Sequence, residues 1–234
     1  MKKKSTNILS NKSAAAIKAE LAKYSDYMNV ATELLDNMVA QGFGENFVVH
    51  LGDTSWTYKE MLDRANRVAE VLVEDCGLLP GNRVLLRAPN TPMLVAAWFG
   101  VLKAGGICVT TMPMLRAREL RVSIDRAHVS IALSDITLSD ELQDALDSTS
   151  SIKHTLYFTN VGNNHKEATL EKLCSTKTGI FENVKTAADD IALIAFTSGT
   201  TGKPKGAMHF HRDIFEVMRS GAFYFNFFLH AYIY

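Results

Sequence analysis

The sequence has 234 residues, 47% of them hydrophobic, which is enough to bury the core of one large domain or two small ones and excludes a disordered chain. Its 25 basic residues balance 25 acidic residues, so no overall field attracts nucleic acid or an anionic membrane surface. We therefore expect no nucleic-acid partner and no membrane association, and any anion site must be a local cluster.

Residues 1–28 are predicted to form a tail and a short helix. The lysine-rich start lacks an apolar core of signal-peptide length, and Ile17, Leu21 and Tyr24 share one apolar helical face. The three cysteines are odd in number and widely spaced, which fits neither a disulfide framework nor close zinc ligands. We expect a cytoplasmic protein with reduced, mostly buried thiols at Cys76, Cys108 and Cys174.

The clearest predicted helix begins at "TYKE". Thr57 is placed to cap it and Glu60 to close a capping box, and Gly77 is expected to end it. The apolar residues recur at helical spacing and predict one buried face. That face consists of Tyr58, Met61, Leu62, Ala65, Val68, Ala69, Leu72 and Val73.

Short apolar runs then alternate with helical stretches. This alternation predicts an α/β fold, with a largely parallel sheet flanked by helices and ligands bound beyond the carboxyl ends of its strands. The polar segment 160–190 reads as a surface excursion with one short helix. The expected strands are 83–88, 107–112, 130–135, 155–159 and 191–196, and the expected helices are 91–104, 116–127 and 139–146.

The stretch "FTSGTTGKPKG" follows the last of these strands. Its glycines free the backbone so that consecutive N–H groups can face one anion, and hydroxyls and lysines add donors and charge. A flexible solvated turn is the alternative. The common P-loop does not fit, because only two residues separate Gly199 from Gly202 and Pro204 follows Lys203. The order of residues favours a phosphate clamp.

The string "TSGTTGKPKG", followed by "HR" at residues 211–212, resembles the signature of the adenylate-forming superfamily, the AMP-dependent synthetases and ligases. The resemblance covers about residues 29–218 and is strongest to the branch of 2-aminobenzoate-CoA and benzoate-CoA ligases. It implies a partial N-terminal AMP-binding domain of an acyl-CoA synthetase-like fold.

The resemblance also implies a reaction. An aromatic carboxylate attacks the α-phosphate of ATP, pyrophosphate leaves, and the thiol of coenzyme A displaces AMP from the acyl-adenylate, with Mg²⁺ neutralising phosphate charge. The loop would hold the β- and γ-phosphates. The residues to which this role is carried are Thr197, Ser198, Gly199, Thr200, Thr201, Gly202, Lys203 and Lys205.

The chain departs from the superfamily pattern after the loop. The adenine, ribose and hinge motifs are missing, and no lysine follows Lys205. We therefore expect a truncated chain that is inactive alone, with an aromatic-rich tail at 219–234 that is either a buried helix continuation or foreign sequence, and too short to span a membrane. The alternative is a non-catalytic nucleotide-binding or interaction module, with a partner chain that supplies the missing domain.

Other residue types have plainer explanations. His209 and His211 lie two apart on a stretch expected to be extended, so a metal pair is conceivable, but a structural role is favoured and no metal site is predicted. Trp98 and Phe99 are expected in the core. A solvated helix face is expected for Arg116, Arg118 and Arg121.

Overall fold

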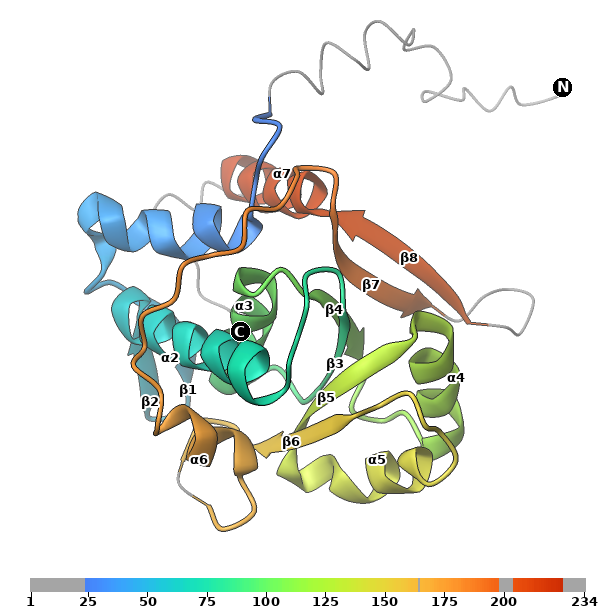
Figure 1. Cartoon of the computed structure of the whole chain (residues 1–234). Helices are drawn as coiled ribbons and strands as arrows, with labels where there is room; N and C mark the ends of the chain where they lie inside the picture. The colour runs from blue at the N-terminus through green and yellow to red at the C-terminus, as the bar shows by residue number, and fades with distance from the viewer. Residues whose placement is uncertain (1–23, 164, 198–203, 225–234) are drawn as a thin grey trace, which may run out of the picture.

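The structure is a computed structural model that describes residues 24–163, 165–197 and 204–224 (Figure 1). The predicted helix through Ile17 and Leu21 and most of the tail at 219–234 lie outside these residues. Within the described ranges, no helix combines the length and the apolar character needed to cross a bilayer.

A six-stranded sheet forms the centre of the molecule, in the order β6-β5-β3-β4-β7-β8. The first five strands pair in parallel, and β8 pairs antiparallel to β7 at the edge. The predicted, largely parallel sheet is confirmed. The strands are β3 (Arg83–Arg87), β4 (Ile107–Thr111), β5 (Val129–Asp135), β6 (His154–Phe158), β7 (Ile191–Thr197) and β8 (Lys205–Phe210).

Helices cover both faces of this sheet (Figure 1). Side chains alternate along β3, so Val84 and Leu86 enter one apolar cluster and Leu85 enters the other. The first cluster includes Phe99 and is packed by Trp98, as expected. Its helices are α2 (Tyr58–Glu70), α3 (Pro92–Lys103), α6 (Thr169–Cys174) and α7 (His211–Tyr224), and those of the second are α4 (Ala117–Ala127) and α5 (Ser139–Leu146).

Several shorter elements complete the described fold. An antiparallel hairpin pairs β1 (Phe47–Leu51) with β2 (Thr54–Thr57). Three π-helical segments were not predicted, because periodicity does not separate a π-helix from an α-helix over five residues. These segments are η1 (Thr32–Asp36), η2 (Val39–Phe43) and η3 (Val71–Asp75), and a 3₁₀ turn, η4 (Ile136–Leu138), precedes α5.

Helix α2 begins as predicted. The Thr57 amide donates to the Glu60 carboxylate at 2.8 Å and the Glu60 amide donates to the Thr57 hydroxyl at 3.2 Å, which completes the capping box. Gly77 ends the helical stretch with φ of +63°. The prediction that Val73 is buried is wrong: it is 38% exposed. It lies in η3, where the wider π-helical turn rotates residues off the apolar face.

The segment 160–190 contains one short helix, α6, as predicted. The stretch after α6 is fixed against α2. The buried Glu70 carboxylate accepts hydrogen bonds from the amides of Thr178 and Ile180 at 2.8 and 2.9 Å, and the Asn66 side chain donates to the Gly179 carbonyl at 2.8 Å. These bonds satisfy backbone groups that the loop cannot pair internally. Helix α7 passes across residue 219, and the domain boundary predicted there stays a prediction.

Candidate functional site

The two ends of the glycine-rich loop meet at the edge of the sheet. Thr197 is the last residue of β7, Lys205 is the first of β8, and the two lie directly opposite each other in the antiparallel pair. The Thr197 hydroxyl donates to the Lys205 carbonyl at 3.5 Å. The structure thus brings together two of the eight predicted phosphate-binding residues at the base of the loop. The other six, Ser198, Gly199, Thr200, Thr201, Gly202 and Lys203, lie outside the described residues.

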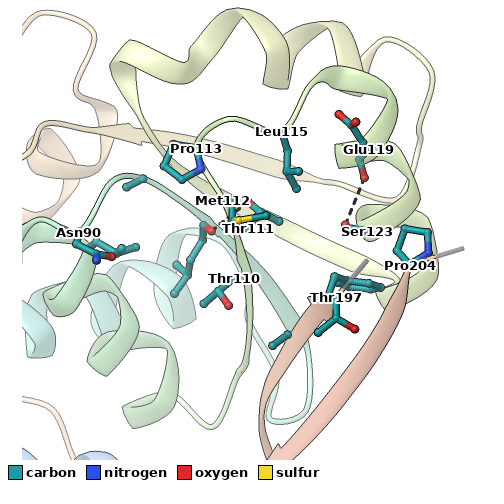
Figure 2. Close-up of a pocket in the computed structure, with 15 residues that line it drawn as sticks. Asn90, Thr110, Thr111, Met112, Pro113, Leu115, Glu119, Ser123, Thr197 and Pro204 are labelled. Atoms are coloured by element: carbon teal, nitrogen blue, oxygen red, sulfur yellow. Dashed lines mark hydrogen bonds between the residues drawn. The ribbon is translucent and has the colours of Figure 1, made fainter. Parts of the chain in front are cut away.

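A cavity of about 610 Å³ lies beside this loop base (Figure 2). It opens at the carboxyl ends of β3, β4 and β7, which is where a parallel sheet is expected to bind ligands. Its walls are mostly apolar, including Leu86, Leu94 and Phe196. Such walls with a few polar groups are typical of a small-molecule site. The polar groups come from Asn90, Thr110, Thr111, Glu119, Ser123 and Thr197.

Helix α4 contacts the carboxyl-terminal end of the glycine-rich loop, at Pro204. Arg126, in the last turn of α4, donates to the carbonyl of Pro204 at 2.5 Å. Pro204 also lines the cavity, so this bond fixes the position where the loop returns to the sheet. Sequence reasoning missed the contact, because the two residues are 78 positions apart and no motif links them.

One wall of the cavity depends on a buried arginine. Arg87 ends β3, is 1% exposed, and donates to the carbonyls of Met112, Pro113 and Leu115 at 3.2, 3.0 and 2.9 Å. Burial lowers the pKa of its guanidinium, and the charge of Glu141 opposes that shift. The sequence contained a signal for this role, a charged residue within an otherwise apolar buried strand.

The two histidines near the loop do not form a pair. His209 lies in β8, whereas His211 opens α7, so the expectation that both lie on one extended stretch is wrong. His211 is 1% exposed, and burial lowers its pKa to about 4 although Asp190 acts in the opposite direction. Its structural role is confirmed by a hydrogen bond from the Val30 amide. Among the residues described, no three histidine, cysteine or carboxylate side chains could hold a metal ion.

The arginines of the α4 region behave differently from one another. Arg116 is exposed and its guanidinium pairs with the Glu141 carboxylate at 2.6 Å, and Arg118 is exposed as well, which confirms the solvated face for both. Arg121 is only partly exposed, and its Nε is buried with no hydrogen-bond partner among the described residues.

Comparison with known proteins gives consistent matches. The profile of the AMP-binding enzyme family matches residues 37–230. A 3-hydroxybenzoate–CoA/4-hydroxybenzoate–CoA ligase from Thauera aromatica is 28% identical over 199 residues, which covers 85% of this chain and 38% of the ligase. An uncharacterized acyl–CoA ligase, YtcI, from Bacillus subtilis is 29% identical over 170 residues, which covers 72% of this chain and 31% of that protein.

Solved structures share the fold. An anthranilate CoA ligase, AuaEII, in complex with anthranoyl-AMP superposes with a TM-score of 0.74 at 20% identity, over 82% of this chain and 36% of that one. A benzoate CoA ligase from Burkholderia xenovorans gives a TM-score of 0.70 at 23% identity, over 82% and 36% of the two chains. The chain therefore spans about a third of the length of these ligases and of the curated relatives above.

Proposed function

Because this chain belongs to the AMP-binding enzyme family, we propose that it is the phosphate-holding part of an ATP-dependent acid–CoA ligase. The observation that carries the proposal is the opposition of Thr197 and Lys205 at the base of the glycine-rich loop, beside a cavity at the carboxyl ends of the sheet. In this proposal the hydroxyl, ammonium and backbone donors of the loop would face one ligand.

The donors of this loop suit a polyphosphate. Each hydrogen bond to a charged group contributes about 1.5–3 kcal/mol, so a few of them suffice for micromolar affinity. The ammonium groups of Lys203 and Lys205 stabilise charge on the β- and γ-phosphates, which makes pyrophosphate a better leaving group. Arg126 assists indirectly, because it holds the Pro204 carbonyl between those two lysines.

The proposed acid substrate is an aromatic carboxylic acid of the 2-aminobenzoate or benzoate type. A relative named as a 3-hydroxybenzoate/4-hydroxybenzoate ligase, and structural neighbours named as anthranilate and benzoate ligases, support it. The apolar walls of the cavity and its volume would accommodate an aromatic ring. The acid's carboxylate would attack the α-phosphate of ATP, and coenzyme A would then accept the acyl group. We propose that this chain does not complete these steps alone.

The Mg²⁺ ion of the proposed reaction would enter with the nucleotide. Phosphate and water oxygens would supply most of its ligands, because Mg²⁺ keeps several waters and binds through substrate phosphates. The protein would contribute the loop that receives this complex.

Calorimetric titration of the 234-residue chain tests the phosphate site. We expect ATP and pyrophosphate to bind, and Lys205→Ala to weaken both by about tenfold, the loss of one charged contact. Lys153→Ala is the matched control, because Lys153 is exposed and precedes β6 at the opposite edge of the sheet. ATP–pyrophosphate exchange with 2-aminobenzoate should be absent. Failure to bind ATP, or an unchanged affinity in Lys205→Ala, would contradict the proposal.

A further inference from the structure

Strand β3 carries an arginine at each end. Each guanidinium donates hydrogen bonds to three backbone carbonyls of its own. Together these bonds attach the two ends of α4 to the central strand β3. Arg83, at the amino end, donates to Gly81, Ala127 and His128, and Arg87, at the carboxyl end, donates to Met112, Pro113 and Leu115. The loop from Met112 to Arg116 leads from β4 into α4.

The two arginines differ in their surroundings. Arg83 is partly exposed, whereas Arg87 is buried, and its Nε has no hydrogen-bond partner among the residues described. Within the described part of the chain, the hydrogen bonds of Arg87 all go to backbone carbonyls, and Glu141 acts on it only through its charge. A buried charge without a paired counter-ion is expensive, and an apolar side chain of similar volume would avoid that cost. In Arg87, the hydrogen bonds from the planar guanidinium to three carbonyls of one loop compensate for the cost of burying its charge.

That loop is a wall of the cavity. Met112, Pro113 and Leu115 all line it, and so do Leu86 and Ala88, the neighbours of Arg87 in sequence (Figure 2). Arg87 itself does not line the cavity. Its effect on a ligand would therefore pass through the loop.

The loop that forms this wall carries two exposed methionines, of which Met112 lines the cavity. Met112 is 57% exposed and Met114 is 77% exposed, and both belong to the loop that Arg87 holds. Methionine side chains are flexible and fit many shapes, so they define a cavity poorly by themselves. A fixed backbone is needed if this wall is to distinguish ligands by size.

We propose that Arg87 is a positioning residue, which fixes the Met112–Leu115 wall and thereby sets the size of aromatic acid that the cavity accepts. This inference rests on the proposed function, because it assumes that the cavity holds the acid. The preference for one acid over another would then depend on the Arg87 guanidinium. Phosphate binding at the glycine-rich loop would not depend on it.

Fluorescence titration with 2-aminobenzoate, and competition with the two-ring acid 1-naphthoate, tests this on the full chain. Wild type should prefer the one-ring acid. Arg87→Met should raise the Kd for 2-aminobenzoate by about tenfold, reduce the preference between the acids, and leave the ATP Kd unchanged. Arg87→Lys should not restore the preference, because one ammonium cannot span three carbonyls.

Arg83→Met is the matched control, since it removes the same three-carbonyl pattern at the end of β3 remote from the cavity. It should lower Tm and leave the preference between the acids unchanged. If Arg87→Met does not fold, Pro113→Gly loosens the same wall while Arg87 stays, and the same loss of preference is expected.

The outcomes separate the two proposals. If wild type binds ATP and both acids, and neither Arg87→Met nor Pro113→Gly changes the preference, only the inference about Arg87 is wrong. An equal change in Arg83→Met would also overturn it, since general destabilisation would then explain the effect. If wild type binds ATP but neither acid, the acid part of the proposed function fails together with this inference.

Discussion

The backbone amide of Val30 donates a hydrogen bond to Nδ1 of His211 at 3.1 Å, across 181 positions of sequence. The bond joins the residues that precede η1 to the first turn of α7, and both partners are buried. It requires an unprotonated Nδ1, so the imidazole is neutral with its proton on Nε2. The start of the described chain and its last helix are thus attached to each other through a titratable group.

This contact predicts a loss of stability in mild acid. The pKa of His211 is about 4 in the folded protein, below the ordinary value of 6.5, so the unfolded chain binds the proton more tightly. The contribution of His211 to the free energy of unfolding is therefore complete above pH 6.5 and decreases as the pH falls toward 4. Between pH 7 and pH 5 the free energy of unfolding should fall by about 2 kcal/mol from this group. Urea unfolding at several pH values measures it.

A variant isolates the contribution of His211 from that of other groups. His211→Asn keeps a hydrogen-bond acceptor but does not titrate, so its unfolding free energy should change less between pH 7 and pH 5 than that of wild type. His128→Asn, at an exposed position with φ of +49°, should retain the wild-type pH dependence. Equal pH dependence in His211→Asn and wild type would contradict the assignment.

Two glutamates of the same helical stretch should differ sharply in their effect on stability. Glu70 is buried and accepts three hydrogen bonds from Thr178 and Ile180, so Glu70→Ala should cost about 2–4 kcal/mol by leaving donors unpaired. Glu74 is exposed and pairs with Lys177, so Glu74→Ala should cost less than about 1 kcal/mol. Chemical denaturation of both variants measures the difference, and similar losses would refute it.

The close approach of α2 and α3 requires a glycine. A Cβ at Gly100 would lie 2.6 Å from Val68 Cγ1 and 3.0 Å from the Ala65 carbonyl oxygen. Gly100→Ala should therefore destabilise the protein by about 1–3 kcal/mol through overpacking. Gly44→Ala, where the nearest atom lies at 3.6 Å, is the control and should be tolerated. The Cβ of Val68 would lie 2.7 Å away as well, so Val68→Gly is needed to remove both close atoms. The double variant Val68→Gly/Gly100→Ala should lose less stability than the sum of the two single losses, and strictly additive costs would argue against the clash.

The thiols should be unreactive in the folded protein. Burial raises the pKa of Cys76 to about 11 and that of Cys174 to about 12, and it raises the pKa of the fully buried Cys108 as well. Since the thiolate is the nucleophile, iodoacetamide near neutral pH should label native protein slowly and all three cysteines rapidly in urea. Mass spectrometry measures the labelling, and rapid reaction of one native thiol would contradict this expectation.

The sequence predicted most of the secondary structure correctly because the signals are local. Thr57 and Glu60 cap a helix through contacts three residues apart, and apolar periodicity distinguishes β3 from α3 without knowledge of their neighbours. The same local character explains the failures. Val73 was misplaced because the change to a π-helical turn at η3 leaves no mark in the apolar pattern.

The candidate site likewise has features that the sequence predicted and features that depend on tertiary packing. The order of glycines, hydroxyls and lysines in residues 197–205 was sufficient to propose a phosphate loop, because that chemistry is carried by consecutive residues. The pairing of Thr197 with Lys205 depends on the antiparallel pairing of β8 with β7, which was not predicted, although the stretch at His209 was expected to be extended. The contact of Arg126 with Pro204 depends on the packing of α4 beside the loop.

The sequence by itself therefore determined the class of fold, the order of its elements and the loop that indicates the family. Only the tertiary structure decided that Arg87 donates to three carbonyls of the cavity wall, that His211 is a buried acceptor, and that Glu70 anchors a distant loop. The physical reason is the distance along the chain over which each kind of interaction acts. Caps, turns and periodicity are set by neighbours along the chain, whereas the partner of a buried polar group is set by which segments the folded core brings together.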